Sequence, residues 1–241
     1  MKNIRLTALL LTLALLLSAL SGCGGETNTP GGTVTPNPTE ATTEPTTAPT
    51  TNTTEKSEGD LGRMEGGTYT NKYTGYSITL DNSWTYYTAK ELQALPENVK
   101  ELFSDSELAD QYNAIADMMA ESATALASIN VQYQKLSPTE RLTYATMSNE
   151  ALVDSMLQQK DFLVNTYTSA GMRDISMEKA TVTFLGESRT VLKTTFTNPQ
   201  GVVCYIAQVQ QYSLGAYGVT LTVTTYNTDT TQTILNMFKP A

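Results

Sequence analysis

A stretch rich in threonine and proline divides the chain and limits which part of it can fold. Residues 24–60 contain 13 Thr and 5 Pro, and Val34 is their only large aliphatic residue. Such a segment cannot bury enough apolar surface to offset the entropy lost on folding. We therefore expect residues 23–60 to be a disordered tether and residues 61–241 to form one globular domain.

Residues 1–22 have the pattern of a signal peptide. Lys2 and Arg5 precede a largely apolar run from Leu6 to Leu20. As a helix this run would reach roughly 22 Å, which is short of the ~30 Å hydrocarbon core of a bilayer. A signal peptide is therefore favoured over a permanent membrane span.

The residues that follow, Leu20-Ser21-Gly22-Cys23, resemble the lipobox of bacterial lipoproteins. In that family the cysteine receives a diacylglyceryl group, with acyl chains such as palmitate, and becomes the first residue after cleavage. The resemblance implies that Cys23 anchors the protein to the extracytoplasmic face of the cell membrane. The alternative is an ordinary secretory cleavage site beside an incidental cysteine.

The absence of histidine restricts the possible chemistry. Ser-His-Asp and Cys-His catalysis and the HExxH zinc motif all require imidazole, and the sequence contains none. Acidic residues outnumber basic ones by 24 to 15, so nucleic acid is not an expected partner. Cys204 lies in an apolar strand and is expected to be a buried thiol. We expect no catalytic residue, cofactor or metal ligand.

Hydrophobic periodicity and capping motifs predict the elements of the domain. The capping motifs include Ser137-Pro138-Thr139-Glu140, and Gly171 is placed to end a helix. The expected helices cover residues 88–96, 104–127, 148–171 and 228–238, with a helical turn from 138. The expected strands lie within 68–80, 129–133, 180–184, 192–196, 202–212 and 219–223.

The order of these elements predicts an α+β fold. Four consecutive strands joined by short turns require a mostly antiparallel sheet. The strand from Val202 to Val209 is apolar on both faces, so it should be covered on both sides. We therefore expect helices on both faces of the sheet, an α/β/α sandwich.

A motif at the start of the domain carries a family resemblance. It reads Tyr69-x-Asn71-x-x-x-Gly75-Tyr76-x-Ile78-x-Leu80-x-x-x-Trp84. Together with the elements that follow, it resembles PsbP-like domains and, more closely, lipoproteins of unassigned function from Gram-positive anaerobes, over roughly residues 67–238. PsbP-like domains mostly bind other proteins and stabilise assemblies. The resemblance therefore implies a binding role, and it transfers no functional site residue.

Aromatic residues gather in the same region. Tyr69, Tyr73, Tyr86 and Tyr87 are candidates for a recognition patch, because aromatic side chains are enriched in binding surfaces. The alternative is that the aromatic residues pack in the core, and Trp84 is expected there.

Two further patterns contain residues that could bind a cation or act in catalysis. Glu107 and Asp110 lie three residues apart in the expected 104–127 helix, where they could hold Ca²⁺ or act as acid and base, or simply complement the helix dipole. Ser176-Met177-Glu178-Lys179 matches the S-x-x-K acylation motif but lies in a strand-like run.

Two functions remain open from the sequence. The first is a lipid-anchored, non-catalytic binding or assembly module of the cell envelope, which contacts the bilayer through Cys23 and binds another envelope protein or a wall polymer. The alternative is an envelope hydrolase that uses a carboxylate pair.

The composition break near Asp60 leads to a first prediction. Limited proteolysis should remove the tether and leave a resistant fragment of about 180 residues, because proteases cut disordered arms faster than packed domains. Mass spectrometry of the fragment checks its boundaries. Protection throughout residues 24–60 would contradict the expected division.

Overall fold

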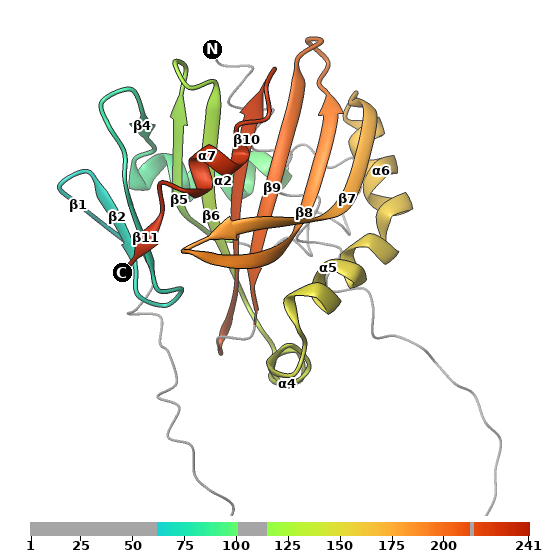
Figure 1. The fold of residues 1–241 in the computed structure, drawn as a ribbon, viewed down its shortest axis with the longest axis horizontal. Helices are drawn as coiled ribbons and strands as arrows, with labels where there is room; N and C mark the ends of the chain where they lie inside the picture. Colours follow the sequence, from blue (N-terminus) through green and yellow to red (C-terminus); the bar gives the residue numbers. More distant parts are fainter. Residues whose placement is uncertain (1–61, 101–114, 213–214) are drawn as a thin grey trace, which may run out of the picture.

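The computed structural model describes residues 62–100, 115–212 and 215–241, which form an α+β fold with antiparallel sheets and few helices (Figure 1). A small sheet has the strand order β1-β2-β3-β11, and a large sheet has the order β4-β5-β6-β10-β9-β8-β7. The small sheet consists of β1 (Arg63–Glu65), β2 (Thr68–Asn71), β3 (Tyr76–Thr79) and β11 (Lys239–Pro240). The large sheet consists of β4 (Thr85–Tyr86), β5 (Ile115–Ser122), β6 (Ala127–Lys135), β7 (Arg173–Phe184), β8 (Glu187–Thr197), β9 (Val203–Gln211) and β10 (Tyr217–Tyr226).

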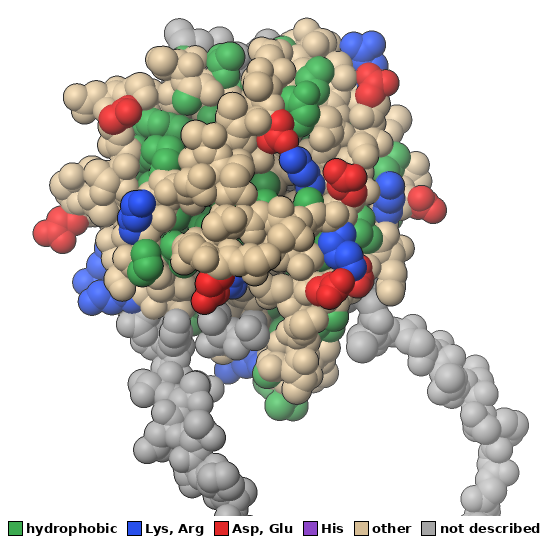
Figure 2. Space-filling view, in the orientation of Figure 1, with side chains coloured by type: hydrophobic (Ala, Val, Ile, Leu, Met, Phe, Trp, Pro, Cys, Tyr) green, Lys and Arg blue, Asp and Glu red, His purple; other side chains and the backbone are tan. Residues whose placement is uncertain are grey.

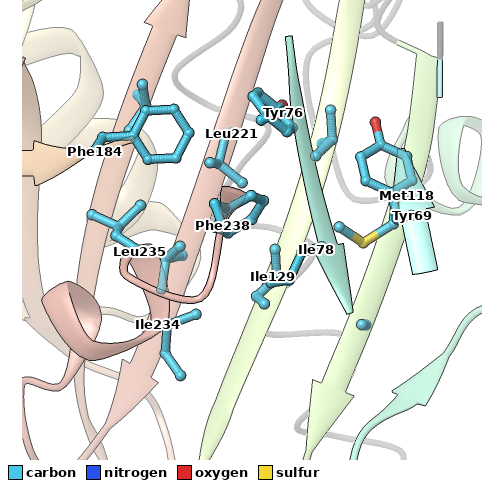
Figure 3. Close-up of a cluster of buried hydrophobic side chains, with 14 of the residues drawn as sticks. Tyr69, Tyr76, Ile78, Met118, Ile129, Phe184, Leu221, Ile234, Leu235 and Phe238 are labelled. Carbon is cyan, nitrogen blue, oxygen red and sulfur yellow. The ribbon is translucent and has the colours of Figure 1, made fainter. Parts of the chain in front are cut away.

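The main core lies between the two sheets (Figure 3). Tyr76 of the small sheet contacts Phe184 and Phe238 edge-on, with ring centroids 5.7 Å and 5.4 Å apart. Edge-to-face contacts of this kind add stability beyond the burial of area. The large sheet contributes alternate apolar residues to this layer, namely Met118, Ile129, Val131, Val209, Val219, Leu221 and Val223.

Two helices cover the opposite face of the large sheet at one side. They are α5 (Asn149–Gln158) and α6 (Lys160–Ser169), and they lie over β7, β8 and β9. Their buried residues pack on those of the strands, in a cluster that includes Val153, Met156, Leu163, Tyr167, Leu192, Phe196, Cys204 and Ile206.

The expected sandwich with helices on both faces is not confirmed. On the face of the main core, the cover consists of the small sheet together with α7 (Thr231–Leu235), a single short helix. A second sheet can fill this layer because its own apolar face needs burial as well. Within the described ranges, no helix has the length and hydropathy of a membrane span.

The clearest error of the sequence analysis concerns the helix expected over 104–127. Residues 115–122 form β5 instead, and the earlier part of the expected helix lies outside the described residues. Met118 and Met119 are both buried although they point to opposite faces of the sheet. A strand buried on both faces has consecutive apolar residues, and a helical period can be fitted to them by chance.

Capping residues predicted helix ends better than hydrophobic periodicity predicted the element over 104–127. In α4 (Pro138–Ala145), Ser137 and Glu140 form the complete capping box that the sequence predicts. Gly171 ends α6 with φ = 82°, in the left-handed conformation, which confirms its expected role. The expected 148–171 helix is divided at Gln159 into α5 and α6, and both helices contact β7.

Two helix boundaries differ from the expectation. α2 (Ala89–Lys100) continues past Pro96, because a proline inside a helix removes one hydrogen bond without always ending the helix. The expected 228–238 helix is reduced to α7, and the chain then pairs with the small sheet as β11.

At two positions of β7, an edge strand of the large sheet, side chains bond to the backbone. Gln232 of α7 accepts a hydrogen bond from the backbone N–H of Thr183 (3.0 Å) and donates one to its carbonyl (2.7 Å). Lys160 donates to the carbonyl of Met177 (3.2 Å). Groups that occupy an edge in this way prevent another strand from pairing there.

The position of Trp84 leads to a second prediction. This side chain is only 8% exposed and belongs to the main core, as expected from the sequence. Trp84→Ala should lower the free energy of unfolding by about 3–5 kcal/mol, because it leaves a large cavity. Urea denaturation followed by circular dichroism measures the change. Leu142→Ala is the matched control, since Leu142 is 75% exposed and its loss should change stability by under ~0.5 kcal/mol. Equal stabilities of the Trp84 variant and the wild type would contradict the core assignment.

Candidate functional site

The four tyrosines of the expected recognition patch do not share one environment. Tyr69 and Tyr73 have no exposed surface, so neither can form part of a binding surface. The hydroxyl of Tyr73 donates to the carbonyl of Tyr217 (3.0 Å) and accepts from its N–H (2.8 Å), which ties the small sheet to β10. Tyr86 and Tyr87 are half-buried, and a recognition role for these two stays a prediction.

A first buried polar group surrounds the carboxylate of Asp117. Its Oδ2 atom accepts hydrogen bonds from the hydroxyl of Tyr69 (2.5 Å), the N–H of Gly62 (3.0 Å) and the side-chain amide of Asn71 (3.1 Å). The same amide donates to the hydroxyl of Tyr69 (2.8 Å). The Tyr-x-Asn part of the sequence motif therefore holds one carboxylate of β5.

The local backbone explains how these residues meet. The register of β5 shifts between Ala116 and Met118, so Asp117 is the extra residue of a β-bulge. A bulge redirects a side chain, here toward β2. Gly62 approaches so closely that a β-carbon there would overlap both the ring of Tyr69 and the carboxylate of Asp117. Only glycine fits this position.

The electrostatics of this group follow from its burial. Desolvation raises the pKa of the Asp117 carboxyl, and the hydrogen bonds from Tyr69, Gly62 and Asn71 offset only part of this effect. Burial also raises the pKa of the Tyr69 hydroxyl well above its usual value. Sequence analysis missed Asp117. The available signal was one acidic residue inside the apolar run 115–120, and the helical interpretation of that run concealed it.

A second buried polar group lies on the large sheet, on the face that points away from the main core. Residues paired across β6, β10 and β9 form two rows, Asn130-Thr222-Gln208 and Gln132-Thr220-Gln210. Directly paired residues share a face of the sheet. We call these six residues the amide–hydroxyl face. Each of them is at most 5% exposed.

Several hydrogen-bonding atoms of this face have no hydrogen-bond partner among the residues that the structure describes. They are Oδ1 of Asn130, Oε1 of Gln208 and both Oε1 and Nε2 of Gln210. Within the two rows, the amide of Gln208 donates to the hydroxyl of Thr222 (3.3 Å). Leaving a buried polar group unpaired costs about 1–3 kcal/mol, and native proteins contain few such groups. The face therefore has unused capacity to bind polar atoms.

The remaining candidate residues have structural surroundings or lie outside the described ranges. Cys204 is buried, which confirms the expected buried thiol, and burial raises the pKa of the thiol to about 12. Lys179 of the S-x-x-K match pairs with Glu150 (2.8 Å) and Asp154 (2.9 Å) of α5. Cys23, Glu107 and Asp110 lie outside the described residues.

The described residues also bear on metal binding. In the ranges 62–100, 115–212 and 215–241, no three His, Cys, Asp or Glu side chains are grouped so that they could hold a metal ion.

Comparison with known proteins finds similarity among solved structures. No protein-family model matches the chain, and no curated protein matches it. Among solved structures, the chain is similar to cyanobacterial PsbP (CyanoP) from Synechocystis sp. PCC 6803, with a TM-score of 0.41 and 12% sequence identity. The alignment covers 75% of this chain and 99% of that chain. That protein is a PsbP, the family that the motif of residues 69–84 resembles.

The raised pKa of Asp117 leads to a third prediction. A carboxyl whose pKa is raised on folding favours the folded state at low pH, and this contribution is lost as the pH rises from about 3.9 through the folded-state pKa. The stability of the wild type relative to Asp117→Asn should therefore fall between pH 4 and pH 7. Urea denaturation of both proteins across this range measures the difference, and ionisations that they share cancel. A difference that increases with pH would show that the hydrogen bonds outweigh the desolvation.

Proposed function

We propose that this protein is a membrane-anchored, extracytoplasmic lipoprotein whose domain is a non-catalytic binding or assembly module of the cell envelope. The anchor rests on the Leu20-Ser21-Gly22-Cys23 sequence after an apolar run. The tether of residues 23–60 would hold the domain away from the bilayer, with a reach between roughly 35 Å as a coil and about 115 Å when nearly extended.

The amide–hydroxyl face is the observation that carries the binding role. The neighbouring part of the same sheet face is apolar at Leu192, Phe196 and Ile206 and packs under α5 and α6. Of the unpaired buried atoms of the described residues, four lie on the amide–hydroxyl face, against one each at Thr194 and Tyr226 beside the residues under α5 and α6. Because such atoms are costly to stability, their concentration favours a face kept for a ligand or partner.

The contacts of the carboxylates support a non-catalytic role. Asp117 is held by three donors, Glu150 and Asp154 share Lys179, and Asp229 pairs with Lys193. Contacts of this kind are common among carboxylates that only stabilise a fold. On the face shown in Figure 2, acidic and basic side chains are interspersed rather than separated by sign.

The anchor leads to a fourth prediction. Cells that express the wild type should incorporate an alkyne-tagged palmitate into the protein, and Cys23→Ala should abolish the label, because Cys23 would carry the acyl chains. In-gel detection of the tag measures this directly, even if an uncleaved signal peptide keeps the variant in the membrane. Cys204→Ala is the matched control and should keep the full label. Labelling of the Cys23 variant would contradict the proposed anchor.

A further inference from the structure

The outer face of the small sheet carries a line of cationic and hydroxyl side chains. Directly paired residues cross all four strands in this line, and they are Arg63, Thr70, Ser77 and Lys239. Successive residues of a strand point to opposite faces, and Tyr76, the neighbour of Ser77, is buried in the main core. The line therefore points away from the core. We call these four residues the cationic row.

The chemistry of the cationic row suits phosphate. Arg63 and Lys239 are exposed and stand at its two ends, three strand spacings or about 14 Å apart between Cα atoms. Guanidinium and ammonium groups form charge-assisted hydrogen bonds with phosphate oxygens. The hydroxyls of Thr70 and Ser77 lie between the two cations and can donate further bonds. The row thus offers donors along its whole length.

The charge around the row is locally positive. Lys72 follows the end of β2 and is exposed, and Glu65 lies on the same outer face, one position beyond Met64. In the four strands and the turns 66–67 and 72–75, the charged residues are therefore three cations and one carboxylate. The whole chain has a net charge of −9. Salt screens exposed charges beyond about 10 Å, so the local excess decides what this face attracts.

The shape and position of the row favour a membrane surface as the source of phosphate. Small ligands bind in concave sites, whereas the row lies on an exposed sheet face. The described chain begins at Gly62, next to Arg63, so the proposed tether joins the domain at one end of the row. A flexible tether sets a largest separation from the bilayer and no smallest one, so the domain can approach the headgroups.

We propose that the cationic row and Lys72 bind the phosphates of anionic lipid headgroups, so that the small sheet faces the bilayer. This inference rests on the proposed anchor and adds the orientation of the anchored domain. Each basic residue near an anionic membrane strengthens association about fivefold, so three give a factor on the order of 100. The tether makes such weak binding effective, because it holds the domain at a high local concentration beside the membrane.

The test measures energy transfer from Trp84 to dansyl-labelled lipid in vesicles that carry the lipidated full-length protein. Trp84 is the only tryptophan of the chain and lies in the main core, beneath the small sheet. Transfer should be higher in vesicles of phosphatidylcholine with phosphatidylglycerol than in phosphatidylcholine alone. About 1 M salt, which shortens the screening length to about 3 Å, should remove the difference.

A triple variant removes the three cations, with the substitutions Arg63→Gln, Lys72→Gln and Lys239→Gln. It should lower the ratio of membrane-bound to unbound domain at least tenfold, so that transfer is the same in both kinds of vesicle. All three side chains are exposed, so the melting temperature should stay within a few degrees of the wild type. If the triple variant fails to fold, Lys239→Gln alone should lower the ratio about fivefold.

The matched control removes three cations outside the small sheet. Its substitutions are Lys90→Gln in α2, Arg173→Gln in β7 and Arg189→Gln in β8. The net charge of the chain changes by the same amount as in the triple variant. The control should keep the higher transfer in vesicles with phosphatidylglycerol, because the row is intact.

Three results would overturn the inference. The first is equal transfer in the two kinds of vesicle for the wild type. The second is a loss of the difference in the control as large as in the triple variant. The third is binding of soluble poly(glycerol phosphate) through the row without any effect of lipid charge on transfer, which would assign the row to a phosphate polymer.

Palmitate labelling separates this inference from the anchor on which it rests. If one of the three results occurs while labelling still depends on Cys23, the orientation is wrong and the anchored lipoprotein stands. If labelling does not depend on Cys23, the proposed anchor fails and the orientation fails with it.

Discussion

Burial of the large sheet on both faces is the constraint on which the rest of the structure depends. β9 and β10 lie at its centre, and nearly all of their residues are buried. One face is covered by the small sheet, in which Tyr76 packs against Phe184 of β7 and Phe238 near the C-terminus. The N–H of Ala241 also donates to the carbonyl of Gly75 (3.0 Å). The start and the end of the domain therefore complete the same layer, which couples them in folding.

The opposite face of the sheet is divided by chemistry. Over β8 and the first part of β9 it is mostly apolar and packs under α5 and α6, whereas over β6, β10 and the second part of β9 it carries amides and hydroxyls. The first part has an unpaired hydroxyl at Thr194, and the second has unpaired atoms at Asn130, Gln208 and Gln210. The proposed binding role starts from this difference.

The sequence predicted the features that depend on local interactions. The capping box of Ser137 and Glu140 and the left-handed Gly171 involve residues within one turn of a helix, so the sequence alone identifies them. The strand character of residues 115–122 depends on pairing with β6, which local periodicity does not encode. The same holds for the second sheet in place of a helical layer, because its residues come from both ends of the domain.

Neither buried polar group could be found from the sequence, for related reasons. Asn130, Gln132 and Gln134 alternate with apolar residues, a pattern typical of a strand with one face in water. The structure buries all three, so their burial depends on tertiary packing and not on the strand itself. Asp117 reaches Tyr69 only because a bulge in β5 redirects its side chain. A bulge has no reliable signature in a single sequence.

The central claim is that the large sheet is buried on both faces, the amide–hydroxyl face included. Nuclear magnetic resonance of the side-chain amide of Gln210 tests it most directly, with signals assigned by comparison with Gln210→Met. The account predicts slow exchange of this amide with solvent, because Gln210 is 2% exposed. Exchange as fast as that of an exposed glutamine would contradict it.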